Sequence, residues 1–135
     1  MLGTDGFTAN LFREALVGHI LQSHLAEDPR AGYAVVPSLP FQANADLARE
    51  TFDPDLGSLR PGAPADIVVW DYRPPTPLAA ANLWGHVMFG LVDARAEEVL
   101  IAGRPALSEG RVIGCDEAEI TARCRNAAED LWKRF

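Results

Sequence analysis

The side chains that most often bind metals or act as nucleophiles are few and widely spaced in this 135-residue chain. It contains three histidines, His19, His24 and His86, and two cysteines, Cys115 and Cys124. His19 and His24 would lie about 140° apart around a helix axis, so they do not face one metal ion together. His86 follows a proline-rich loop, and we expect its side chain to pack against other residues or to cap a helix instead of binding a metal. The cysteine spacing fits neither a CxxC pair nor a disulfide framework. These residues alone predict no metal site and no redox site.

The composition is that of a globular protein without a nucleic-acid or membrane surface. The formal net charge at pH 7 is −7, whereas nucleic-acid and anionic-membrane surfaces need clustered Lys and Arg. No stretch approaches the roughly 20 apolar residues of a bilayer span. The opening residues show no basic segment and no apolar signal core. The two cysteines form no disulfide framework, which is typical of proteins in a reducing compartment. We therefore expect a cytoplasmic protein that binds neither nucleic acid nor membrane.

Helical periodicity is clear near both ends of the chain. Apolar residues recur at three- and four-residue steps from Asn10 to Leu25, with Thr8 or Asn10 as the N-cap. A shorter helix is expected at 42–51, after a connection at 32–40. The tail from Asp116 to Phe135 forms a third helix, with Asp116 and Glu119 as a capping-box pair. Its apolar stripe comprises Ile120, Cys124, Ala127, Leu131 and Phe135.

Strand patterns occupy the middle of the chain. The run of β-branched and aromatic residues from Ile67 to Asp71 predicts a strand buried on both faces. Further strands are expected at 87–91 and 98–102, and then at 106–108 and 111–113, with Gly-containing turns between the last three. The sequence therefore predicts helices followed by a small antiparallel meander and a terminal helix.

Two motifs add a family resemblance to this pattern. The first is LGTDGF at residues 2–7, and the second is GSLRPGAPADIVVWD at residues 57–71. Together they resemble the C-terminal third of the amidohydrolase superfamily, in the branch of cytosine and guanine deaminases and triazine chlorohydrolases. The segments at 71–78 and 82–90 look like the SsnA-type aminohydrolases. Because a Gly-Thr-Asp-Gly turn usually follows a strand, the sequence is expected to begin partway through a longer protein.

The resemblance implies an α/β fold, in which the chain is the C-terminal fragment of a (β/α)₈ metal-dependent hydrolase barrel plus the C-terminal part of its small β-sandwich domain. Residues 1–55 would hold the last strand end and helices of the barrel. Residues 56–113 would belong to the β-sandwich, with Asp66 and Asp71 in structural roles. Residues 114–135 would form the C-terminal helix.

The resemblance also implies that Asp5 is both catalytic and a metal ligand, at the end of the last barrel strand. The cofactor of the complete enzyme would be a divalent metal, zinc or iron, and the substrate a small amine or amidine-type heterocycle whose non-peptide C–N bond is hydrolysed. Asp5 would exchange a proton with the attacking water. The family's ligating histidines lie upstream of this segment, so this chain alone is expected to bind no metal and to be inactive.

A non-catalytic module derived from an amidohydrolase is the alternative. Exposed strand edges and a surface that once covered a barrel favour a homo-oligomer. In either case, burial of Ile67, Val68 and Val69 is expected to anchor the β-layer. The terminal helix is the nearest candidate to cover it, and the helix that carries Leu16 and Ile20 is the next.

Overall fold

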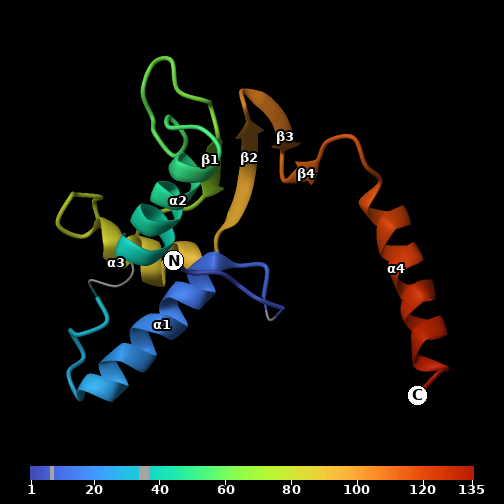
Figure 1. The fold of residues 1–135 in the computed structure, drawn as a ribbon, viewed down its shortest axis with the longest axis horizontal. Helices are drawn as coiled ribbons and strands as arrows, with labels where there is room; N and C mark the ends of the chain where they lie inside the picture. The colour runs from blue at the N-terminus through green and yellow to red at the C-terminus, as the bar shows by residue number, and fades with distance from the viewer. Residues whose placement is uncertain (7, 34–36) are drawn as a thin grey trace.

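The computed structural model describes residues 1–6, 8–33 and 37–135, and it combines a group of helices with a four-stranded antiparallel sheet (Figure 1). The last helix stands apart from both (Figure 1). In chain order the elements are α1 (Leu11–Ala26), a π-helical segment (Pro37–Ala43), α2 (Asn44–Thr51), β1 (Ile67–Asp71), α3 (Leu83–Phe89), a 3-10 turn (Leu91–Asp93), β2 (Arg95–Ile101), β3 (Arg104–Ser108), β4 (Arg111–Val112) and α4 (Glu117–Trp132). Among the described residues, none of the helices is both long enough and apolar enough to cross a membrane.

The first helix forms where its periodicity predicts it. Of the two candidate N-caps, Asn10 is the one used: its side-chain oxygen accepts hydrogen bonds from the backbone N–H groups of Phe12 and Arg13, at 3.0 and 3.2 Å. The same amide donates to the carbonyl of Val92 at 2.9 Å. Asn10 therefore starts α1 and also fastens it to the turn after α3.

The second helix is confirmed in outline. It covers Asn44–Thr51, and the π-helical segment Pro37–Ala43 leads directly into it. The plain connection expected at 32–40 is therefore correct only in part. Residues 34–36 of that connection lie outside the described part of the chain, residues 32 and 33 form a turn, and residues 37–40 belong to the π-helical segment.

The meander is confirmed, with strand order β1-β2-β3-β4 and antiparallel pairing throughout. Two-residue turns join its last three strands. Ala102 and Gly103 have φ of 48° and 75°, and Glu109 and Gly110 have φ of 50° and 69°. Positive φ at both central residues matches the right-handed twist of a hairpin. Asp66 accepts a hydrogen bond from the N–H of Ala102 at 2.7 Å, which agrees with a structural role for this carboxylate.

The prediction of a strand at 87–91 is wrong, because those residues belong to α3 and to the 3-10 turn after it. A short apolar run does not distinguish a strand from a buried helix. Here the preceding residues decide the outcome: Asn82 accepts from the N–H of Ala79 and donates to the carbonyl of Pro77, at 2.8 and 2.9 Å. This turn directs the chain into a helix, and Val87 and Met88 are buried on it.

The core is small and lies between α1 and α3. Met88 is 1% exposed and Ala15 is 3% exposed, and the two form one cluster. Leu2 and Leu16 pack against this pair and are partly buried. The N-terminal segment is therefore part of the same packing unit as the two helices.

The expectation that β1 is buried on both faces is wrong for this chain. Val68 and Val69 are 44% and 48% exposed, and only Ile67 and Trp70 are half-buried. In the described part of the chain β1 lies at the edge of the sheet, paired with β2. The terminal helix does not provide the proposed cover, because α4 projects away from the sheet (Figure 1).

Candidate functional site

Asp5 lies in the first turn of the chain, just before α1. It is exposed, and its φ of 48° places it in the left-handed region. Asp and Asn tolerate this conformation better than most residues because their short side chains can bond locally. Gly3 and Gly6 flank it without positive φ, so the residue that reverses the backbone is Asp5 itself. The turn expected from the Gly-Thr-Asp-Gly tetrapeptide is thus present.

A side-chain clamp holds the segment that leads to Asp5. The N–H of Leu2 donates to Oδ1 of Asn44 at 3.0 Å, and Nδ2 of Asn44 donates to the carbonyl of Leu2 at 2.8 Å. The Asn44 amide thereby pairs with Leu2 as a neighbouring strand would, using one donor and one acceptor. Asn44 begins α2, so this helix fixes the backbone three residues before Asp5. Sequence reasoning gave Asn44 no role, because its partner lies 42 residues away.

The described residues do not supply a metal site around Asp5. Within residues 1–6, 8–33 and 37–135, no group of three or more His, Cys, Asp or Glu side chains is placed so that it could hold a metal ion. A zinc site needs three or four protein ligands. Asp5 therefore offers one carboxylate, and the donor set among the described residues does not by itself fit a metal.

His86 is engaged on both sides of its ring. The hydroxyl of Tyr72 lies 2.6 Å from Nδ1, and the hydroxyl of Thr76 lies 3.1 Å from Nε2. Gly90 permits this approach, since a Cβ at that position would lie 2.2 Å from the Tyr72 oxygen. With both nitrogens occupied, His86 links α3 to the proline-rich loop after β1. This arrangement agrees with the expected packing role.

A shallow pocket of about 340 Å³ opens beside His86. Tyr33 and Phe89 contribute to its wall and also flank the ring of His19, edge to face, at centroid distances of 6.1 and 5.9 Å. Nδ1 of His19 is buried without a hydrogen-bond partner among the described residues. The ring of His19 therefore packs between two aromatic side chains, whereas His24 is exposed.

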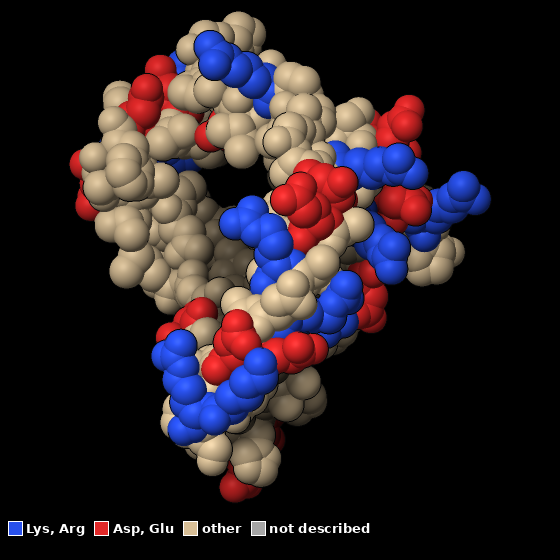
Figure 2. All heavy atoms as spheres, turned by 90° about the vertical axis from the view of Figure 1, so that its right-hand side faces the viewer, with Lys and Arg blue, Asp and Glu red and all other residues tan. Residues whose placement is uncertain are grey.

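The charges show no concentration of one sign on the face that carries α4. Lys and Arg side chains alternate there with Asp and Glu (Figure 2). Elsewhere, Arg30 donates two hydrogen bonds to the carboxylate of Asp28, at 3.0 Å each, and this contact lowers the pKa of Asp28 from its ordinary value. Neither residue lies near Asp5 in the sequence, and the pair closes the loop after α1.

Comparisons with known proteins connect this chain to deaminases. It is 29% identical over 139 residues to a 5-methylthioadenosine/S-adenosylhomocysteine deaminase of Pelotomaculum thermopropionicum, which covers 98% of this chain and 31% of that protein. It is also 29% identical over 135 residues to a 5'-deoxyadenosine deaminase of Methanothermobacter thermautotrophicus, with coverage of 96% and 31%. No family model matches the chain.

A solved structure shares the fold. An adenosine deaminase from Xanthomonas campestris with bound zinc superimposes with a TM-score of 0.67 at 24% identity, over 90% of this chain and 28% of that one. The chain spans about 31% of the length of the curated relatives that it matches. Along nearly its whole length, the chain is therefore similar to proteins named as deaminases.

Proposed function

We propose that this chain is the C-terminal part of a metal-dependent aminohydrolase that removes ammonia from a small heterocyclic substrate. The observation that carries the proposal is the alignment of 98% and 96% of the chain with two deaminases. Their names point to an adenine nucleoside as the substrate. The reaction would add water to the ring carbon that bears the amino group, break the C–N bond and release ammonia.

Asp5 is the residue of this chain that we assign to the chemistry. The divalent metal, zinc or iron, would lower the pKa of the attacking water; the zinc of the solved neighbour supports a divalent metal. The other ligands would come from residues outside this chain, since the described residues offer no complete set. The Asp5 carboxylate would carry a proton towards the leaving nitrogen. The clamp between Leu2 and Asn44 would set the position of this carboxylate.

By the same reasoning, the 135 residues alone would be inactive. A second candidate function, a non-catalytic module that assembles with copies of itself, is favoured by the amount of apolar side chain left uncovered. On α1 alone, the exposed apolar residues are Val17, Ile20, Leu21 and Leu25, with Leu25 at 77%. A surface of this kind marks an interface with another protein or with more of the same chain.

The test is to express the longest reading frame that contains this chain and to measure ammonia release from 5′-deoxyadenosine and S-adenosylhomocysteine with zinc or iron supplied. Asp5→Asn should reduce the rate by roughly 100-fold or more. Asp53→Asn is the matched control, because Asp53 is an exposed carboxylate in a turn and accepts a backbone N–H at 2.8 Å, a bond that asparagine can keep. Full activity in the Asp5→Asn protein would refute the role of Asp5. A protein that releases no ammonia from either nucleoside would favour the non-catalytic module.

A further inference from the structure

The helix α4 is built to pack against something, yet it stands apart from the rest of the chain (Figure 1). Its apolar residues are uncovered: Ile120 is 45% exposed, Leu131 46%, Trp132 70% and Phe135 93%. An isolated helix of 16 residues is marginal in water, because helices in proteins draw most of their stability from a packed apolar face. The helix α4 therefore needs a partner surface.

The spacing of its apolar residues suits another helix as that partner. Ile120, Cys124, Ala127 and Leu131 follow one another at steps of four, three and four residues. This is the alternation of the a and d positions of a two-stranded coiled coil, and it forms a narrow seam instead of a wide apolar face. Small side chains at the two central positions, Cys124 and Ala127, allow close approach of the two helices.

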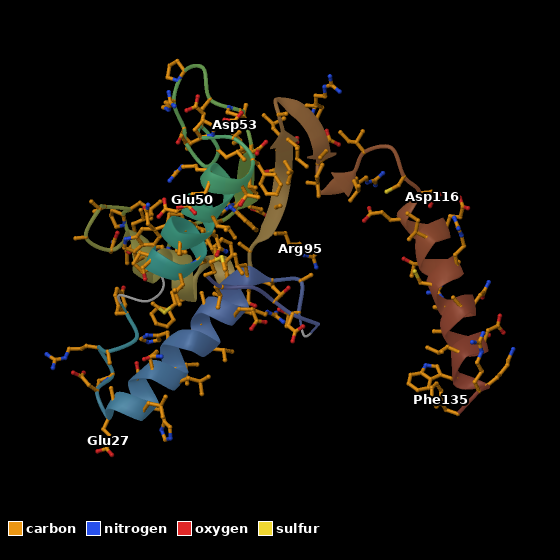
Figure 3. The ribbon with its side chains drawn as sticks, in the orientation of Figure 1. Glu27, Glu50, Asp53, Arg95, Asp116 and Phe135 are labelled. Atoms are coloured by element: carbon orange, nitrogen blue, oxygen red, sulfur yellow. The ribbon has the colours of Figure 1, made fainter. Side chains whose placement is uncertain are left out.

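The charges of α4 favour an antiparallel second copy of the same helix. Asp116 caps its first turn, which carries Glu117 and Glu119, and Lys133 and Arg134 directly follow its last residue, Trp132. Asp116 and Phe135 lie at opposite ends of the helix (Figure 3). Two copies side by side in the same direction would bring acid to acid and base to base. In opposite directions, the acidic end of each copy meets Lys133 and Arg134 of the other.

The same arrangement also pairs the charges that flank the seam. If Ile120 of one copy faces Leu131 of the other, then Cys124 faces Ala127, and a two-fold axis passes between them. In this register Arg123 on one helix lies beside Asp130 on its partner, at matching flanking positions. The pair occurs twice in a dimer. Asp130 also accepts a hydrogen bond from Lys133 of its own helix at 2.8 Å, and a carboxylate has room for both donors.

We propose that two copies of this chain associate through α4, antiparallel and related by a two-fold axis, with the seam Ile120–Cys124–Ala127–Leu131 buried between them. The seam is short, so the dimer is weak and depends on protein concentration. Its formation is independent of catalysis and of any metal.

A charge exchange on the full 135-residue chain tests the pairing. Arg123→Asp and Asp130→Arg each replace two attractive contacts per dimer by two repulsive ones, and each should weaken dimerisation about tenfold in sedimentation equilibrium. The double variant restores opposite charges across the interface and should regain most of the lost affinity. Residues 123 and 130 are two turns apart on one helix, so a recovery reports a contact between copies. Equal weakening in the double variant, or no effect of either single change, would overturn the proposal.

A cross-link tests the register. In a Cys115→Ser background, Ala127→Cys places each new thiol opposite Cys124 of the partner, and mild oxidation should give a covalent dimer in high yield. Glu129→Cys in the same background is the control, because position 129 lies away from the seam, and it should cross-link poorly. A chain that stays monomeric at all concentrations, or that forms only large aggregates without the 124–127 cross-link, would overturn the proposal as well.

Discussion

Met88→Ala tests whether the small core between α1 and α3 sustains the fold. Met88 is 1% exposed and packs with Ala15, so truncation removes three heavy atoms from the most buried position described. Changes of this type cost about 2–5 kcal/mol. Ala15 is too small to fill the space, whereas the side chains of Leu2 and Leu16, which pack against the pair, can change rotamer and fill part of it. This partial relaxation places the expected loss at about 3 kcal/mol.

Urea unfolding followed by far-ultraviolet circular dichroism measures the loss. With a slope of about 2 kcal/mol per molar urea, the midpoint should fall by about 1.5 M. Leu25→Ala is the control: Leu25 lies on α1 but is 77% exposed, so its midpoint should change by less than about 0.3 M. All proteins must be compared at one concentration, because association stabilises the folded state. An unchanged midpoint for Met88→Ala would show that the stabilising contacts lie elsewhere.

Three further outcomes are expected. Asn44→Ala removes both hydrogen bonds to Leu2 and should lower the free energy of unfolding by about 1–3 kcal/mol in the same titration; a change below about 0.5 kcal/mol would mean that the segment carrying Asp5 is held by other contacts. Val68→Asp should cost no more than about 1 kcal/mol, because the side chain is 44% exposed, and loss of cooperative unfolding would reveal a cover over β1. After extensive dialysis, elemental analysis should find far less than one zinc or iron per chain, because one carboxylate cannot hold either tightly; about one metal per chain, lost on Asp5→Ala, would contradict this and point to ligands from a second copy.

The elements that the sequence predicts well are those specified by neighbouring residues. Asn10 and Asp116 each cap the helix that follows them, and the residue type and the apolar periodicity that follows identify both as caps. Gly103 and Gly110 mark the two hairpin turns. The failure at 87–91 has the opposite origin, because the choice between helix and strand there depends on Asn82 and on burial against α1.

The site is less accessible to sequence reasoning because its contacts are distant in the chain. Asp5 is singled out by family resemblance, and its role stays a prediction. The clamp on Leu2 comes from a residue 42 positions away, and the hydroxyl of Tyr72 reaches His86 across 14 positions. Periodicity cannot report such pairs. Sequence reasoning did not predict the exposure of Val68 for a related cause. An apolar strand pattern indicates that the strand is normally packed against other residues, but it does not indicate which part of a protein provides them.

The left-handed hairpin turns also bear on the order in which the chain folds. The strands β2, β3 and β4 span residues 95–112 without a long loop, and hairpins of this kind form in about 1–10 μs. Pairing of β1 with β2 must first close a loop that contains α3, which carries a larger entropic cost. The meander should therefore nucleate the sheet, with β1 added later. In stopped-flow experiments, Gly103→Ala, which strains a turn at φ 75°, should slow folding more than it accelerates unfolding, and the reverse pattern would place the nucleus elsewhere.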